Sequence, residues 1–229
     1  MPENRYDAKL RENNRIILEL TRGNQVLRLE LAFEIRKLIE KHKNPRILEI
    51  GSGEGDLTKY ILQHNPTIKI DALDVSPEMI ASSKKELSAF IDRINFICED
   101  VSKYLQNIKK KYDVITEAWT IHNFKWEDKN TIFKQIHEAL AEGGTFIMMD
   151  KLYPDNPDQQ EELLTTQLRR YEYLDVELRK EITDHELQDY REEFKMEETQ
   201  TIDILKEIGF KNIRIVDRSD RDVVLIASK

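Results

Sequence analysis

The chain is poor in cysteine. Its 229 residues include one, Cys98, so no disulfide can form within the chain, because a disulfide joins two cysteines. A lone thiol is also typical of the reducing cytoplasm, where disulfides are rare. We therefore expect a cytoplasmic protein that is held together by a packed core, for which this length is ample.

Long apolar runs are missing as well. No stretch approaches the roughly 20 apolar residues of a membrane-spanning helix, and the start, MPENRYDAKLRENN, lacks the apolar segment of a signal peptide. Positive charge is not in excess either, because 36 Lys and Arg face 44 Asp and Glu, a formal charge of −8. This balance argues against binding of nucleic acid through its phosphates, and we expect no membrane association.

Glycine and proline are scarce, with seven and six residues, so their positions are informative. Two helical stretches are expected before Pro45, over about 4–22 and 24–42, with Gly23 between them. After Pro45 the pattern changes. Short apolar runs rich in Ile, Val or Phe, typical of buried parallel strands, then alternate with helical spacing. Strands are predicted at 46–50, 68–74, 94–98, 112–118 and 144–150, and helices at 56–64, 77–91, 101–109 and 127–141.

The alternation stops after Asp150. A long helix is predicted to start at Asn156-Pro157, and a shorter helix to start at Asp184. A helix at 197–208 ends at Gly209, and two strands, 211–217 and 222–227, follow as a hairpin. The apolar face of the long helix comprises Leu164, Leu168, Tyr171, Leu174, Leu178 and Ile182.

These patterns predict one α/β domain over residues 1–229. Its core is a doubly wound, mostly parallel, seven-stranded sheet with an antiparallel C-terminal hairpin. Two helical additions are expected to cover the site, namely an N-terminal cap over 1–44 and a lid over 154–196, inserted after the fifth strand.

Three of the seven glycines lie in the turn after the first predicted strand, in the segment ILEIGSGEGD. Such a turn lets the backbone bend sharply and lets a ligand lie against it. A dinucleotide needs the spacing G-x-G-x-x-G, whereas Asp56 takes the third glycine's place. Carboxylates at Glu49, Glu54 and Asp56 would repel a pyrophosphate, and no Gly-Lys-Ser/Thr follows. The turn therefore favours a cationic ligand over a phosphorylated one.

ILEIGSGEGD resembles the E/D-x-G-x-G-x-G motif of class I S-adenosylmethionine (SAM)-dependent methyltransferases. SAM has a sulfonium and an ammonium but no phosphate, so an acidic, glycine-rich turn suits it. The resemblance implies that the cofactor is bound by Glu49, Gly51, Ser52, Gly53 and Gly55.

The ends of the next two predicted strands agree with this family. IDALDVSPEMI ends its strand with Asp74, which the resemblance places on the two ribose hydroxyls, a task that suits the two oxygens of a carboxylate. Val75 and Met79 would be apolar walls for the adenine. INFICEDVSKY ends with Asp100 and Val101, which the family places beside the adenine amino group and a ring nitrogen. Asp100 also suits a helix N-cap, and the two interpretations are compatible.

The fourth strand and its exit loop, YDVITEAWTIHNF, resemble the part of small-molecule methyltransferases that passes the methionine end of SAM and meets the acceptor. The resemblance implies backbone contacts from Glu117 and Ala118 to the cofactor. Trp119 and His122 would face the acceptor, and Tyr171 of the lid is a further substrate-binding candidate. The motifs cover residues 46–150.

Methyl transfer from a sulfonium is an in-line displacement, which needs alignment and the exclusion of water. His122 is the candidate general base, because an imidazole titrates near neutrality. A well-positioned acceptor can also react without a base. The five histidines show no metal-ligand spacing, so no metal is expected.

The predicted function is methyl transfer from SAM to a nitrogen, oxygen or sulfur of a small molecule, which leaves S-adenosylhomocysteine (SAH), by a monomer or homodimer. Two alternatives stay open. Enzymes that form carboxy-SAM for transfer-RNA modification are similar in their long insertion after the fifth strand, and Arg169, Arg170 and Tyr171 are candidates to hold the added carboxylate. A non-catalytic, SAM-binding regulatory subunit would keep the same glycines and acidic contacts.

Overall fold

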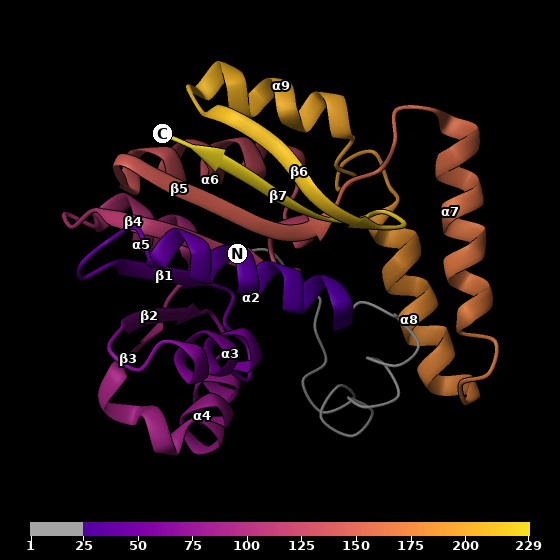
Figure 1. Ribbon diagram of the computed structural model, residues 1–229. Coiled ribbons are helices and arrows are strands. Elements are labelled where there is room, and N and C mark those ends of the chain that lie inside the picture. Colours follow the sequence, from indigo (N-terminus) through magenta and orange to yellow (C-terminus); the bar gives the residue numbers. More distant parts are fainter. Residues whose placement is uncertain (1–24) are drawn as a thin grey trace.

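A computed structural model of the chain describes residues 25–229, so the helix expected over about 4–22 lies outside the described residues. Seven strands form one sheet in the order β3-β2-β1-β4-β5-β7-β6 (Figure 1). The first five strands run parallel, and β7 lies antiparallel between β5 and β6. The predicted doubly wound sheet with its C-terminal hairpin is confirmed. The strands are β1 (Arg46–Ile50), β2 (Lys69–Asp74), β3 (Ile94–Cys98), β4 (Tyr112–Ala118), β5 (Leu140–Lys151), β6 (Lys211–Ser219) and β7 (Asp222–Ser228).

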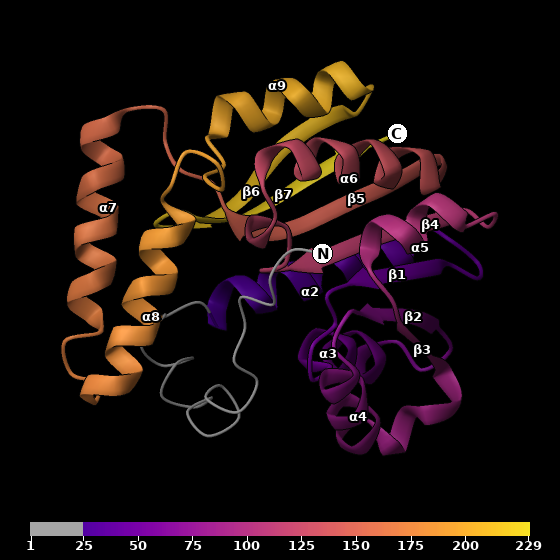
Figure 2. The same cartoon turned by 180° about the vertical axis from the view of Figure 1, so that it is seen from behind.

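Helices cover both faces of the sheet. One apolar cluster joins α2 and α3 to one face, and a second joins α5, α6 and α9 to the other (Figures 1 and 2). No helix of the described residues is long and apolar enough to cross a membrane. The helices are α2 (Gln25–Ile39), α3 (Asp56–His64), α4 (Pro77–Glu86), α5 (Val101–Asn107), α6 (Trp126–Ala139), α7 (Pro157–Arg170), α8 (Val176–Asp189) and α9 (Glu198–Ile208), with 3-10 turns at Ser88–Arg93 and Ile121–Asn123.

Helix α2 lies flat on the sheet. Leu27, Leu31 and Ile35 follow one another at helical spacing, and all three are buried against sheet residues such as Val224. The described part of the expected N-terminal cap therefore belongs to the core layer. Only its first turn reaches the ends of the strands, where the Arg28 guanidinium lies 3.6 Å from a carboxylate oxygen of Asp56.

The long helix expected from Asn156-Pro157 is wrong, because the chain forms two helices there. Helix α7 ends at Arg170 and α8 begins after Asp175, whose side chain caps it by accepting a hydrogen bond from the Leu178 N–H. The helix expected to start at Asp184 is instead part of α8. The two helices lie side by side as a hairpin beyond the ends of the strands (Figures 1 and 2), and the apolar stripe predicted for one helix is shared between them.

Burial explains the break. A continuous helix would hold its apolar stripe out in water, whereas the hairpin buries Tyr171, Leu178 and Ile182 against each other. The turn at residues 171–174 contains no glycine or proline. The end of α7 therefore could not be predicted from the residues that usually mark helix ends.

Candidate active site

The glycine turn lies at the carboxyl end of β1, in the middle of the sheet. Gly51, Gly53 and Gly55 all have left-handed backbone, with φ of 67°, 53° and 90°. A Cβ on Gly51 would lie 2.0 Å from the Thr120 hydroxyl oxygen, whereas a Cβ on Gly53 would have no atom of the described residues within 4 Å. Gly51 therefore allows the turn to pack against the loop after β4, and Gly53 leaves bare backbone facing open space.

Asp74 pins this turn to the end of β2. Its Oδ2 accepts a hydrogen bond from the Gly53 N–H at 2.8 Å, and its Oδ1 accepts one from the Ser76 N–H at 2.9 Å. Each carboxylate oxygen has a second lone pair, so both can also accept from hydroxyl groups of a ligand. Val75, next in the chain, is 60% exposed and offers apolar surface there, while Met79 is buried in α4.

Asp100 lies on the neighbouring strand end. Its side chain caps α5 by accepting a hydrogen bond from the Lys103 N–H at 3.1 Å, so the N-cap interpretation is confirmed. The Glu99 N–H donates to the Asp74 carbonyl at 3.1 Å and ties this strand end to β2. Val101 is buried in the first turn of α5. The contacts of Asp100 and Val101 with an adenine stay predictions.

Glu49 is buried below the glycine turn. The Thr58 hydroxyl donates to its Oε2 at 2.5 Å. Burial, opposed by that hydrogen bond and assisted by the charges of Asp56 and Asp74, raises the pKa of Glu49 to about 8. Beside it, the Ser52 hydroxyl is buried and has no hydrogen-bond partner among the described residues. The floor of the turn thus holds polar groups that a bound ligand can still engage.

The Glu117 side chain holds the loop after β4. It is fully buried, and its Oε2 accepts hydrogen bonds from the backbone N–H groups of Thr120 at 2.9 Å and Ile121 at 3.4 Å. Burial, together with the nearby charge of Asp150, raises the pKa of Glu117 well above its ordinary value. The expected contacts of Glu117 and Ala118 with a cofactor would use their backbone, and they stay predictions.

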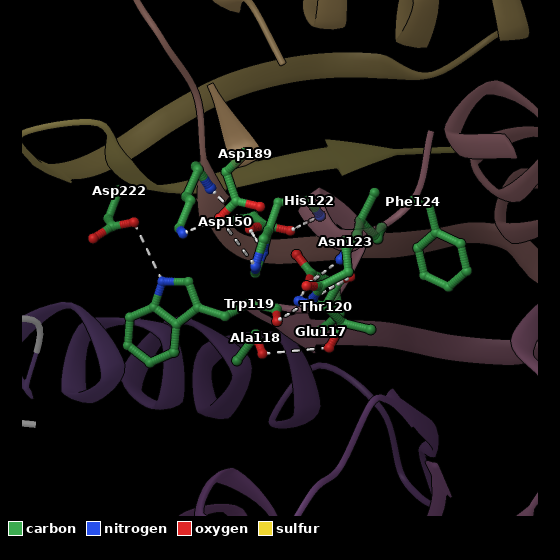
Figure 3. Close-up of polar contacts among 12 residues, drawn as sticks. Glu117, Ala118, Trp119, Thr120, His122, Asn123, Phe124, Asp150, Asp189 and Asp222 are labelled. Carbon is green, nitrogen blue, oxygen red and sulfur yellow. Dashed lines mark hydrogen bonds and ion pairs between the residues drawn. The ribbon is translucent and has the colours of Figure 1, made fainter. Parts of the chain in front are cut away.

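Trp119 marks the sharp bend of this loop. Its φ of 52° is unusual for a residue with a bulky side chain. The indole N–H donates to Asp222 at 3.3 Å (Figure 3), and the Arg28 guanidinium lies 5.1 Å from the centre of the ring. Trp119 is therefore held between the start of α2 and the β6–β7 hairpin, beside the glycine turn.

His122 is buried and is held from one side by Asp150, at the end of β5 (Figure 3). One oxygen of Asp150 lies 2.6 Å from His122 Nδ1, and the other accepts the His122 backbone N–H at 2.9 Å. Burial alone would raise the pKa of Asp150, but His122 and the backbone hydrogen bonds hold it below its ordinary value. Asp150 is thus ionised, Nδ1 carries the proton, and Nε2 points away from it, 3.9 Å from Asp189 of α8.

The structure adds a buried cluster of charges that sequence reasoning missed. Lys151 Nζ lies 2.5 Å from Asp189 Oδ2 and 3.3 Å from Glu186 Oε2, and Arg221 also pairs with Glu186. All four side chains are buried, and they join α8 to the ends of β5 and β7. The sequence hinted at this cluster only through Asp150 and Lys151, two charged residues that directly follow the apolar run of β5. The residues of α8 look like an ordinary polar helix face.

Tyr171 lies inside the helix hairpin rather than on an open surface. Its hydroxyl donates to Glu186 at 2.9 Å and accepts from Gln167 at 2.6 Å. Contact with a substrate stays a prediction that this position does not favour. The other residues suggested for a carboxylate are placed elsewhere, since Arg170 pairs with Asp220 at 2.6 Å and Arg169 is exposed.

A family model described as a methyltransferase domain matches residues 48–146. This stretch runs from β1 into β5 and carries the glycine turn, Asp74, Asp100, Glu117 and His122. Residues 48–146 are thus similar to a methyltransferase domain. The match ends before Asp150 and before the α7–α8 hairpin, so the methyltransferase domain accounts for the glycine turn but not for the buried charges around Lys151.

Known proteins resemble parts of this chain. Malonyl-[acyl-carrier protein] O-methyltransferase 1 of Ilyobacter polytropus is 40% identical over 103 residues, which are 44% of this chain and 36% of that protein. The carboxy-S-adenosyl-L-methionine synthase of Nautilia profundicola is 24% identical over 191 residues, 80% of this chain and 77% of the relative. The chain thus spans little more than a third of the first relative but most of the second.

Two solved structures share the fold. PigF with SAH has a TM-score of 0.61 at 22% identity, over 82% of this chain and 51% of that one. Human N-acetylserotonin methyltransferase in complex with SAM has a TM-score of 0.62 at 19% identity, over 93% of this chain and 55% of that one. At these identities the likeness supports the sheet order and its helices, and nothing finer.

Proposed function

We propose that this chain is a SAM-dependent methyltransferase that acts on a nitrogen, oxygen or sulfur of a small molecule. The observation that carries the proposal is the glycine turn, where the open Gly53 backbone lies beside the Asp74 carboxylate at the centre of a parallel sheet. Ligands of such sheets bind at the carboxyl ends of the strands, where the strand order reverses between β1 and β4.

The residues present fit this cofactor. When bound, SAM supplies a methyl group on a sulfonium. Asp74 would accept from its ribose hydroxyls, and Val75 would lie against the adenine. The Ser52 hydroxyl, which has no hydrogen-bond partner among the described residues, and the Glu49 carboxyl are polar groups beneath the turn that the amino acid end of the cofactor would meet.

His122 is the proposed base for acceptors that must lose a proton. Asp150 lies against Nδ1, so Nε2 is the ring nitrogen left to take a proton from the acceptor. Both side chains are buried, which keeps water away from the reaction. Trp119 would line the same chamber, and α7 and α8 would form a lid over it within a single domain. A small acceptor, a cytoplasmic location and a monomeric or homodimeric state belong to this proposal.

Calorimetry with SAH tests cofactor binding. Asp74→Ala removes an ionised acceptor of hydroxyl groups, worth about 1.5–3 kcal/mol, so the affinity is expected to fall at least tenfold. Asp92→Ala, an exposed substitution with the same change of charge, is the control and should leave the affinity unchanged. Equal affinities for the two variants, or clean titration by ATP or NADH instead, would contradict the proposal. Incorporation of labelled methyl groups into a panel of small acceptors separates an enzyme from a regulatory subunit.

Carboxy-SAM formation is the second candidate, because the relative with that name matches 80% of this chain and so extends into the lid. Arg170 pairs with Asp220, and the Tyr171 hydroxyl donates to Glu186. These two side chains therefore do not form a binding site for the added carboxylate of carboxy-SAM. Mass spectrometry of the ligand that co-purifies with the protein decides between the two. A mass above that of SAM by one carboxyl group would favour the second candidate.

A further inference from the structure

Three metal-ligating side chains meet where the α7–α8 hairpin touches the loop after β4. They are His122 of the 3-10 turn and His185 and Asp189 of α8, and their ligand atoms all lie within 4.8 Å of one another. Asp189 Oδ2 is 3.4 Å from His185 Nε2 and 3.9 Å from His122 Nε2. His185 and Asp189 are four residues apart, which places them on the same face of the helix.

We propose that His122, His185 and Asp189 bind a divalent transition-metal ion. Two imidazoles and one carboxylate are a ligand set that zinc and its neighbours accept. Metal–ligand bonds of about 2.0–2.1 Å in a tetrahedral site separate ligand atoms by about 3.3 Å. The separations of 3.4 and 3.9 Å and the bound of 4.8 Å on the remaining pair exceed that value by at most about 1.5 Å, so rotations of the side chains can close the site.

The surroundings prepare His122 for this role. Asp150 accepts the Nδ1 proton of His122 at 2.6 Å, which leaves Nε2 directed toward Asp189. A carboxylate behind a ligating histidine fixes the tautomer and the orientation of the ring, as in many zinc sites. His122 and Asp189 are buried, and the His185 side chain is 18% exposed, which leaves a route from solvent.

Lys151 is the competitor for this site. Its ammonium group lies 2.5 Å from Asp189 Oδ2, so it supplies the positive charge that Asp189 requires. A metal ion must displace Lys151 from Asp189. Glu186, 3.3 Å from Lys151 Nζ, offers the lysine a second carboxylate at which to stay. The affinity of the site for a metal ion is therefore set by the competition between the ion and Lys151 for Asp189.

Four-coordinate zinc with three protein ligands keeps one position open. His122 belongs both to this site and to the chamber proposed for the acceptor. A bound ion would take the Nε2 lone pair that the base requires, so His122 serves either as ligand or as base at one time. The metal site itself does not depend on the proposed methyl transfer.

The test uses tag-free protein freed of metal with EDTA and titrated with Co²⁺ and Zn²⁺, with calorimetry and visible absorption as readouts. We expect one Co²⁺ per chain, with the intense visible bands of a tetrahedral site. His185→Gln should lower the affinity at least tenfold, whereas His64→Gln, an exposed histidine outside the cluster, should not change it. Binding that His185→Gln leaves unchanged, or no binding at all by the wild-type protein, overturns the proposal.

Lys151→Met gives the second, opposite readout. Removal of the competing ammonium group should tighten Co²⁺ binding several-fold, and an affinity equal to or below that of the wild type contradicts the placement of the ion. Circular dichroism checks that each variant folds. SAH binding by His185→Gln should equal that of the wild type, so a failed metal site and a failed cofactor site give different results.

Discussion

At the scale of single residues, the glycines of the turn after β1 do different work. Gly51 has no room for a side chain because the Thr120 hydroxyl would be 2.0 Å from its Cβ, whereas Gly53 has room but lies where a ligand is expected. On this proposal, packing requires the glycine at one position and a ligand would require it at the other.

The two glycines therefore give a matched pair of variants. Gly51→Ala combines left-handed strain with a clash and should lower the free energy of unfolding by about 2–4 kcal/mol. Gly53→Ala carries only the strain, about 1 kcal/mol, but should weaken SAH binding at least tenfold. Urea unfolding and calorimetry measure the two effects. Equal losses of stability in both variants would show that Thr120 moves aside freely.

Glu49 predicts a dependence of stability on pH. Its pKa in the folded protein is about 8, above the ordinary 4.5, chiefly because of burial. The folded state keeps this proton between those two values and the unfolded chain loses it, so the contribution of Glu49 to stability falls as the pH rises from about 4.5 through 8. Glu49→Gln should remove this loss, on the order of 3–5 kcal/mol between the two limits.

Urea unfolding of the wild type and of Glu49→Gln at pH 5 and pH 8.5 measures this effect. The variant should gain stability relative to the wild type at the higher pH, and the exposed substitution Glu86→Gln is the control. A constant difference at both pH values would mean that Glu49 titrates near its ordinary pKa in the folded protein.

At the scale of elements, the α7–α8 hairpin is held by an apolar cluster and by buried hydrogen bonds beside it. Tyr171 packs against Leu178 and Ile182, and its hydroxyl joins Gln167 to Glu186. The hydroxyl thus links the last turn of α8 to the last turn of α7.

Tyr171→Phe keeps the packing and removes this link, which leaves a buried oxygen of Glu186 with one donor fewer. We expect the free energy of opening of the hairpin to fall by about 1–3 kcal/mol. Hydrogen exchange should rise in α7 and α8 and stay constant in the sheet. Tyr173→Phe, at a position 93% exposed, is the control. Equal exchange in the two variants would assign no structural role to the hydroxyl.

At the scale of the whole molecule, buried charge pairs dock the hairpin on the sheet. Glu186 of α8 pairs with Arg221 in the β6–β7 turn, and Arg221 also donates to the Tyr153 hydroxyl at 2.7 Å. Since such pairs rarely add net stability over apolar contacts, their value here is to specify one docked position.

Arg221→Met should be costly, about 3–5 kcal/mol, because it leaves Glu186 a buried carboxylate with one cation fewer. Adding Glu186→Gln should then recover part of the loss, with a coupling of about 1–3 kcal/mol in a double-mutant cycle measured by urea unfolding. Arg214→Met, at an exposed arginine whose guanidinium is 3.8 Å from Glu34, should change stability by less than about 0.5 kcal/mol. An additive cycle would mean that the pair does not hold the hairpin.

The sequence by itself determined the mostly parallel, doubly wound sheet, its C-terminal hairpin and the position of the glycine turn. Apolar runs such as 46–50 and 112–118 and caps such as Ser76-Pro77 act over a few residues, so local spacing reports them. The resemblance predicts that Asp74 and Asp100 share one site, which parallel strands allow because they end at the same edge of the sheet.

Only the tertiary structure decided what lies above that edge. The break of the long helix at Tyr171 and the meeting of His122 with Asp150, His185 and Asp189 follow from how the hairpin docks on the sheet. Such contacts join segments far apart in the chain, and each is favourable only after the others have formed. A local pattern cannot report them, because burial and charge pairing are properties of the assembled fold.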